Sequence, residues 1–190
     1  MNTANTDIVL WESFRKGDRE AFATLFKQHY ETLYRYGNKF TGNAALLEDT
    51  IQELFIELWQ AKSRTPVVSI RAYLLKSLKY KLLKDFRKKG RVVSLSAGPD
   101  IAFEWSHEHF LIAEQESAEI KQSVLNALTH LSNRQKEIIY LKFYQNLSYE
   151  EVSEIMNINY QVARNLLYQA IKSLKGLLAG AIALYFLFPS

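Results

Sequence analysis

Residues 147–159 read LSYEEVSEIMNIN, and this stretch has the sequence marks of a helix-turn-helix. Ser148 and Glu151 form a capping box, which predicts that the first helix begins directly after Ser148. Asn157 can adopt the left-handed conformation that ends a helix, and Asn159 can cap the helix that follows. The residues expected to be buried in the first helix and the turn are Val152, Ile155, Met156 and Ile158.

The second helix of this pair is predicted to present an inward stripe and an outward face. The inward stripe comprises Tyr160, Ala163, Leu167, Ala170, Ile171 and Leu174. The outward face near its N-terminal half comprises Gln161, Val162, Arg164, Asn165 and Tyr168. In a helix-turn-helix such outward positions enter the major groove, where arginine can bond guanine and glutamine or asparagine can bond adenine. A helical hairpin that merely packs is the alternative, but the agreement of caps, turn and stripe favours DNA binding.

A second motif, D-x-x-Q-E-x-F-x-x-x-W, occupies residues 49–59 within a helix predicted over 44–61. Asp49, Gln52 and Glu53 stand three and four positions apart and therefore share one helix face. The opposite, apolar face comprises Ile51, Leu54, Phe55 and Leu58. The acidic and amide face is either a docking surface for a basic or polar protein element or an ordinary solvated face.

The positive charge of the chain is concentrated in a helix predicted from about residue 70 to residue 89, after a break at Pro66. Residues 71–91 hold nine basic side chains and one acid, a net charge of +8 against +4 for the whole chain. Such a density neutralises phosphates, and interleaved aromatic rings can stack on unpaired bases. Tyr73, Phe86 and the leucines are expected in the core and Tyr80 outside it. The candidate DNA-binding residues are Lys76, Lys79, Tyr80, Lys84, Arg87 and Lys88.

The rest of the composition excludes several classes of protein. The absence of cysteine excludes a disulfide framework, a zinc finger, an iron–sulfur centre and a cysteine nucleophile. No nucleophile–base pair or phosphate-binding glycine loop is visible, and His107 and His109 lack further ligand spacing for a metal. We therefore expect no catalytic residue, no cofactor, no metal and no small-molecule substrate. No secretory signal is visible at the start, so a soluble, cytoplasmic protein is expected.

The pattern along the chain predicts an all-α protein with two helical domains joined by a flexible linker. The expected domains are residues 9–90, a helical bundle, and residues 115–175, the helix-turn-helix domain. Residues 91–114 form the expected linker, which is acidic, with helices resuming from about Ile112. The apolar tail, 176–190, is too short to span a bilayer and is expected to extend the last helix and pack on its own domain or the linker. Contact with a partner protein and attachment to a membrane surface are the alternatives for this tail.

These motifs, in this order, resemble the sigma-70 family of bacterial transcription initiation factors in its short extracytoplasmic-function (ECF) branch. The resemblance covers about residues 9–89 and 120–175. It implies a sigma2-like domain, a sigma4-like domain and a flexible linker between them. It also implies core RNA polymerase and promoter DNA as partners, with an anti-sigma factor as a further one.

The resemblance assigns roles to the motifs. Asp49, Gln52 and Glu53 would dock on the clamp helices of the polymerase β′ subunit. The basic helix and the loop 62–69 would read and melt the −10 element, the loop capturing a flipped base. The helix-turn-helix would bind the −35 element while resting on the β flap.

The chain also departs from the family pattern. Tyr80 and Lys84 stand where similar sequences often have asparagine and aspartate, so their −10 preference does not transfer. Tyr168 and Gln169 replace common basic residues, which predicts weak −35 affinity compensated by the polymerase. A conventional helix-turn-helix regulator, binding duplex operators as a symmetric dimer without polymerase, is the alternative function. The basic helix beside the acidic face disfavours it, because an operator binder needs neither.

Overall fold

The computed structural model describes residues 3–61, 67, 69–88, 101–105 and 118–187, with side chains at 7–61, 67, 69–88, 101–105 and 122–178. Every regular element in the described ranges is helical, which confirms the all-α prediction. The helices are α1 (Thr3–Arg15), α2 (Arg19–Gly37), α3 (Ala44–Ala61), α4 (Ile70–Lys88), α5 (Ala118–Thr129), α6 (Asn133–Ile139), α7 (Tyr149–Met156) and α8 (Tyr160–Leu187). A π-helical turn, η2 (Tyr140–Tyr144), continues α6.

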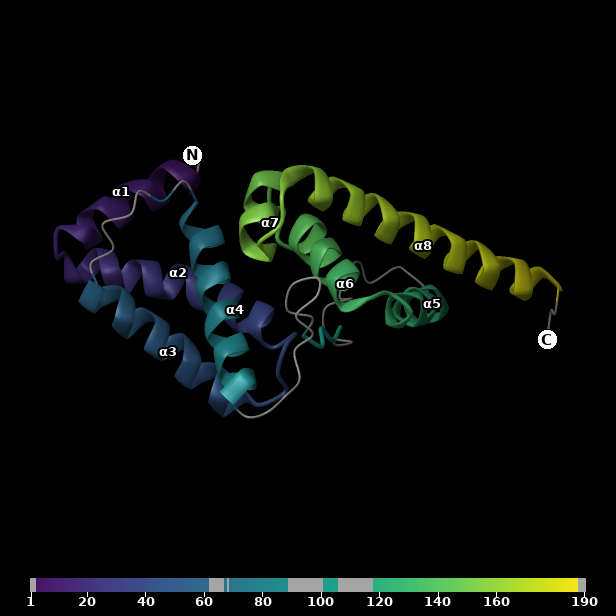
Figure 1. Ribbon diagram of the computed structural model, residues 1–190, viewed down its shortest axis with the longest axis horizontal. Coiled ribbons are helices and arrows are strands. Elements are labelled where there is room, and N and C mark those ends of the chain that lie inside the picture. Colours follow the sequence, from purple (N-terminus) through teal and green to yellow (C-terminus); the bar gives the residue numbers. More distant parts are fainter. Residues whose placement is uncertain (1–2, 62–66, 68, 89–100, 106–117, 188–190) are drawn as a thin grey trace. The chain divides into compact units, whose positions relative to one another are not determined.

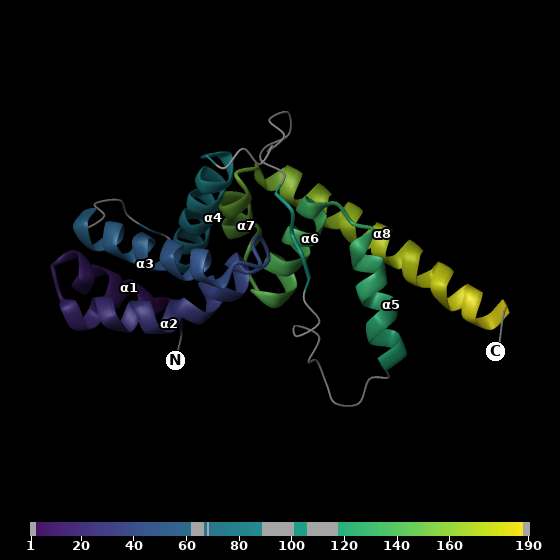
Figure 2. The same cartoon turned by 90° about the horizontal axis from the view of Figure 1, so that it is seen from below.

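The chain divides into two compact units: residues 1–101 with 154–157 make the first, and residues 102–153 with 158–190 make the second. The N-terminal unit is the bundle α1–α4, in which α1 lies beside α2, and α4 packs on α2 and α3 (Figures 1 and 2). Its second helix starts where Asp18 accepts hydrogen bonds from the N–H groups of Glu20 and Ala21, at 2.8 and 3.2 Å. The first helix begins at Thr3, six residues before the expected domain boundary.

Aromatic side chains from three helices form part of the core of this bundle. Phe22 of α2 lies with its ring centroid 5.0 Å from that of Trp59 and 5.9 Å from that of Phe55, both on α3. Phe14 of α1 joins them at 5.5 Å from Phe22. Edge-to-face and tilted arrangements at these distances are attractive beyond the apolar area they bury. The cluster therefore holds α3 in place through its apolar face.

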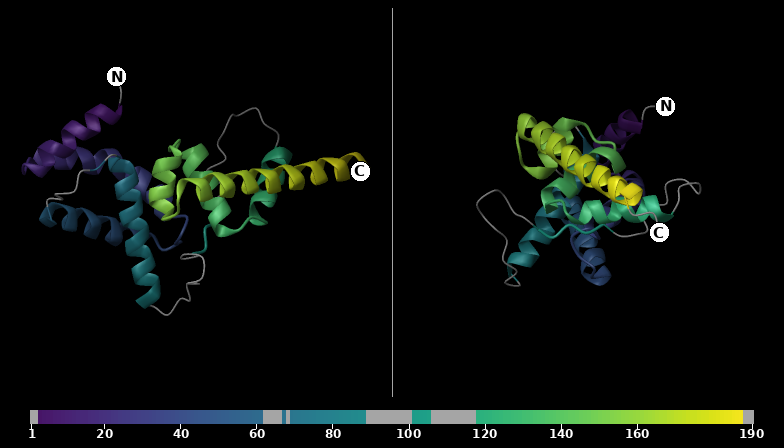
Figure 3. Two further views of the ribbon diagram at one scale, coloured as in Figure 1. Left: turned by 45° about the horizontal axis from the view of Figure 1, so that its top comes forward. Right: turned by 90° about the vertical axis from the view of Figure 1, so that its right-hand side faces the viewer.

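The C-terminal unit is built around α8, against which α5 and α6 pack. Ser132 caps α6, accepting from the Gln135 N–H while the Gln135 side chain accepts from the Ser132 N–H. The helix α8 continues without a break to Leu187, as the left view of Figure 3 shows. This confirms that the tail extends the last helix, whereas the packing of its side chains beyond Leu178 lies outside the described residues.

A short part of the expected linker packs on the C-terminal unit. Phe103 is buried, and its N–H donates to the side-chain oxygen of Asn133 at 3.1 Å. The rings of Phe103 and Trp105 lie against Tyr140 at the end of α6. The residues at which helices were expected to resume, from Ile112, lie outside the described ranges.

Candidate nucleic-acid and docking interfaces

The helix-turn-helix forms with the caps that its sequence predicts. Ser148 Oγ accepts from the Glu151 N–H at 3.2 Å, and Glu151 accepts from the Ser148 N–H at 2.8 Å. Asn157 has φ 52°, the left-handed conformation that ends α7. Asn159 Oδ1 accepts from the Val162 N–H at 2.8 Å and so caps α8. The residues expected to be buried in α7, Val152, Ile155 and Met156, are buried.

All five residues predicted to face outward from α8 are exposed: Gln161, Val162, Arg164, Asn165 and Tyr168. The Gln161 amide N–H donates to Asn165 Oδ1 at 3.1 Å, so these two side chains are held together one turn apart. The Tyr168 side chain is 68% exposed, which leaves its hydroxyl and ring open to a ligand. The first three turns of α8 therefore present amide, guanidinium, apolar and phenol groups on one surface.

The assignment of Tyr160 to the inward stripe is wrong. Its side chain is 44% exposed, and its ring lies 5.6 Å from that of Tyr149 and 6.0 Å from the Arg164 guanidinium. Tyr160 is the first residue of α8, where the helix has not yet reached the core that buries Ala163 and Leu167. The stripe thus begins one turn later than the periodicity indicates, and Tyr160 supports Arg164 instead.

Lys142 is a residue that the sequence motifs did not identify. Its ammonium donates to the Leu147 carbonyl and lies 4.5 Å from the Tyr149 ring centroid. These contacts join η2 to the segment that leads into α7. No local motif marks Lys142, because its partners depend on the π-helical turn and on the left-handed Asn146 (φ 47°) that follows it.

The face of α3 that carries Asp49, Gln52 and Glu53 is exposed, and the opposite face is buried as predicted. Glu53 is held in place from α4: the Lys81 ammonium lies 3.1 Å from Glu53 and 2.7 Å from Glu57. Burial acts to lower the pKa of Lys81, but its hydrogen bonds to Glu57 and Glu53 and their charges outweigh this, so the pKa is raised. Lys81 therefore stays charged and orients the acidic face.

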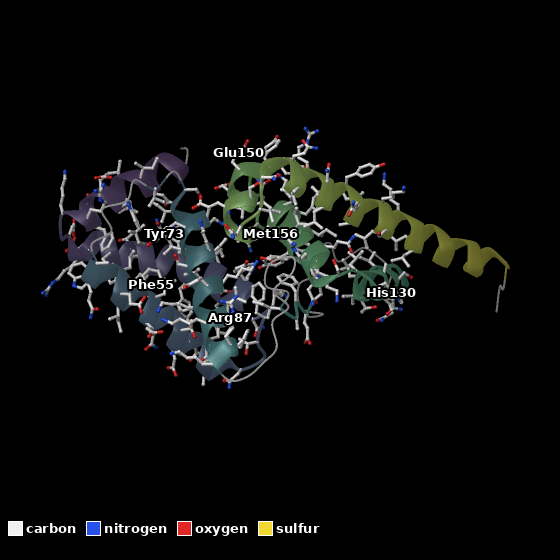
Figure 4. The ribbon with its side chains drawn as sticks, in the orientation of Figure 1. Phe55, Tyr73, Arg87, His130, Glu150 and Met156 are labelled. Atoms are coloured by element: carbon white, nitrogen blue, oxygen red, sulfur yellow. The ribbon has the colours of Figure 1, made fainter. Side chains whose placement is uncertain are left out.

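Four of the predicted basic residues of α4, with Tyr80, lie on its exposed side: Lys76, Lys84, Arg87 and Lys88. Lys76, Tyr80 and Lys84 follow at four-residue steps, so they form one stripe along the helix. Tyr80 is 66% exposed, whereas Phe86 and the leucines of α4 are buried, as expected. Figure 4 labels Tyr73, in the first turn of α4, and Arg87, in its last turn.

Lys79 does not lie on that stripe. Its side chain is 7% exposed, and its ammonium lies 5.9 Å from the centroid of the Phe40 ring, which follows α2. The stem of Lys79 thus packs between helices, as long cationic side chains can.

The predicted base-capturing loop 62–69 lies largely outside the described residues, which include only Val67 and Ser69. Ser69 Oγ accepts from the Ala72 N–H at 3.2 Å and begins α4. His107 and His109 also lie outside the described residues. Within the described ranges, no cluster of three or more His, Asp or Glu side chains could hold a metal ion, and no helix has the length and apolarity to cross a bilayer.

Comparison with known proteins matches both units. The family model for sigma-70 region 2 matches residues 25–92, and that for sigma-70 region 4 matches residues 121–174. The ECF RNA polymerase sigma factor BldN of Streptomyces coelicolor is 28% identical over 178 residues, covering 89% of this chain and 64% of BldN. The ECF sigma factor SigK of Mycobacterium ulcerans is 24% identical, covering 90% of this chain and 92% of SigK.

Solved structures share the fold. The sigma factor RpoE of Bartonella quintana, in complex with the anti-sigma factor NepR, has a TM-score of 0.57 at 20% identity, covering 83% of this chain and 96% of that one. CnrH, in complex with the cytosolic domain of CnrY, has a TM-score of 0.61 at 19% identity, covering 92% of this chain and 97% of that one. With both units matched in order by sigma-70 models and by ECF relatives, the chain belongs to the sigma-70 family of RNA polymerase sigma factors, in its ECF branch.

Proposed function

We propose that this sigma factor binds core RNA polymerase and directs it to promoters through three surfaces. The observation that carries the proposal is that an acidic docking face, an exposed basic stripe and a capped helix-turn-helix occur in one chain. The N-terminal domain, residues 9–90, would supply the first two surfaces, and the C-terminal domain, residues 115–175, the third. Bond formation would remain with the polymerase, so the chain itself would not be an enzyme.

The docking face would be Asp49, Gln52 and Glu53, which would contact the clamp helices of the β′ subunit. These side chains are exposed on α3 and backed by the aromatic core, so they are presented on a rigid element. The pairing of Glu53 with Lys81 supports this role, because it restricts the motion of one carboxylate of the docking face before a partner binds.

The basic stripe would hold the −10 element as it opens. Lys76, Lys84, Arg87 and Lys88 would neutralise phosphates, and the exposed Tyr80 ring would offer a stacking surface for a freed base. Lys79 is left out of this surface, because its side chain is buried and its ammonium lies beside the Phe40 ring.

The recognition helix would read the −35 element with Gln161, Val162, Arg164, Asn165 and Tyr168, while its domain rests on the β flap. Since Arg164 is the only basic residue among these five, we expect weak affinity for duplex DNA without polymerase. An anti-sigma factor would be a regulatory partner, as in the RpoE–NepR complex. A protein that binds RNA polymerase in this way would act in the cytoplasm.

Binding to purified core polymerase tests the docking face. We expect D49N/Q52A/E53Q to weaken binding by about tenfold or more, since it removes two charges and one amide from an exposed protein contact. The matched control is E31Q on α2, which removes one exposed charge elsewhere in the same bundle. Equal binding by the triple variant and the wild type would exclude this face. A conventional operator-binding regulator would instead bind duplex DNA as a dimer and ignore the polymerase.

A further inference from the structure

Residues 102–105 lie in an extended segment that is part of the folded C-terminal unit. Phe103 is 1% exposed, which is as buried as the core leucines, while Ala102 and Glu104 on either side are exposed. The alternation is that of an extended chain lying on a surface with every second residue turned inward.

The segment is held at two points, the start of α6 and the turn η2 that continues it. At the start of α6, the Phe103 N–H donates to Asn133 Oδ1 at 3.1 Å. At η2, the Phe103 ring lies 5.7 Å from that of Tyr140, and the Trp105 ring lies 5.8 Å from Tyr140 and 4.9 Å from Tyr144. All three pairs have edge-on geometry, which is favourable for aromatic rings. Tyr140 is itself fixed, because the Gln145 amide donates to its hydroxyl at 2.8 Å.

This anchor shortens the stretch of sequence that connects the two units. Without it, the connection would run from Lys88, the last residue of α4, to Ala118, the first of α5. With it, the connection ends at Ala102. At about 3.6 Å per residue, the maximum reach falls from about 108 Å to about 50 Å.

We propose that Phe103 and Trp105 are positioning residues that limit the distance between the two promoter elements that this sigma factor can use. The inference rests on the proposed function, in which one unit holds the −10 element and the other the −35 element. Each base pair added between the elements lengthens the duplex by about 3.4 Å, roughly one extended residue of tether. A short tether therefore penalises long spacers, and a longer one relieves the penalty.

Two insertions of the same sequence distinguish an effect of the anchor from an effect of the total linker length. Eight glycine and serine residues are inserted either after Ala97, before the anchor, or after Ala113, behind it. Initiation is measured with the reconstituted holoenzyme on promoters whose spacer grows by one base pair at a time. For each variant, initiation on a lengthened spacer is divided by initiation on that variant's best spacer. Insertion after Ala97 should raise this ratio about threefold for spacers that are longer by two or more base pairs. Insertion after Ala113 should leave the wild-type profile unchanged.

The anchor itself is tested with F103A/W105A. Loss of both rings should broaden the spacer profile of the natural linker, and in this background the two insertions should behave alike. The matched control is E104A, which changes the exposed residue between them. Helix content by circular dichroism confirms that the variants fold. Identical profiles for the two insertions in the native background, or no response to either, would overturn the proposal.

Hydrogen exchange of the Phe103 amide in the full-length protein tests the anchor without transcription. Slow exchange is expected, with acceleration of about tenfold or more in N133A, because the acceptor of that amide is removed. Rapid exchange in the wild type would also overturn the proposal. In the promoter assay, a wild-type protein that selects no start site at any spacer would refute both the proposed function and the tether inference. Selection that ignores tether length refutes the tether inference alone.

Discussion

Arg164 and Lys88 each bring one positive charge to a proposed DNA surface, but in different settings. Arg164 lies on the recognition helix with its guanidinium 6.0 Å from the Tyr160 ring, a support that restricts its direction. Lys88 is the last residue of α4 and is exposed. The first setting suits contact with a base edge, and the second suits a phosphate.

We therefore expect R164A and K88A to differ in kind. R164A should weaken the binding free energy by about 1–3 kcal/mol on promoters that carry the preferred base of Arg164 and by little on others. K88A should weaken binding to all promoters and reduce the slope of log K against log salt concentration by about one. Open-complex formation on a −35 library at several salt concentrations measures both. An unchanged promoter ranking in R164A would show that Arg164 does not read bases.

His29 predicts a pH dependence of stability. Burial lowers its pKa below the ordinary value of 6.5, against the attraction of Asp7 at 3.6 Å and with a further lowering by Arg71. The unfolded chain therefore binds more protons at this position, so stability is complete above pH 6.5 and falls as the pH drops toward the folded pKa. Urea unfolding should give a lower free energy of unfolding at pH 5 than at pH 7. In H29Q the difference between the two pH values should be smaller.

The control for His29 is H130Q, which changes an exposed histidine at the end of α5. It should leave the pH dependence as in the wild type. A wild-type urea midpoint that is equal at both pH values, or an unchanged dependence in H29Q, would contradict the account.

Between helices, the close approach of α2 and α3 depends on Gly37. A β-carbon at Gly37 would overlap the Leu47 side chain of α3 and lie 3.3 Å from Leu78 Cδ2 of α4. Leu47 and Leu78 are both fully buried, so neither can move aside without disturbing the core. The contact places α3, and with it the docking face, against the rest of the bundle.

G37A should destabilise the protein by about 1–3 kcal/mol, the usual cost of overpacking a core. The matched control is G42A, five residues later, where a β-carbon would meet nothing within 4 Å. Denaturant unfolding of the two variants measures the difference. Equal stability of G37A and G42A would show that the helices separate readily and that the docking face is not rigidly held.

The sequence predicts individual helices well where a strong local signal marks their ends. The sequence predicts a helix over residues 44–61, which are the bounds of α3, because the apolar period there is regular and Pro66 follows. Ser148 and Asn159 likewise mark the starts of α7 and α8. The π-helical turn η2 and the exposure of Tyr160 could not be predicted, because both depend on which neighbours the helix meets rather than on its own period.

For the whole molecule, the sequence indicates two helical units and their order, but not the contacts between distant segments. Phe103 and Trp105 stand in a stretch with no sustained helical period, and Asn133 lies 30 residues away from Phe103. The burial of Lys79 and the pairing of Lys81 could not be predicted for a similar reason. Residues 71–91 hold nine basic side chains, and only the packing of α4 decides which of them are buried, paired or exposed. Candidate surfaces can thus be found from sequence, whereas the individual residues on them need the packing.

Mapping of transcription start sites with purified core polymerase on a genomic promoter library, with and without this protein, tests the central claim most directly. The account predicts that the protein binds the core enzyme and that defined start sites, preceded by a shared pair of elements, appear only in its presence. Failure to bind the core enzyme, or binding that produces no selected start sites, would contradict it.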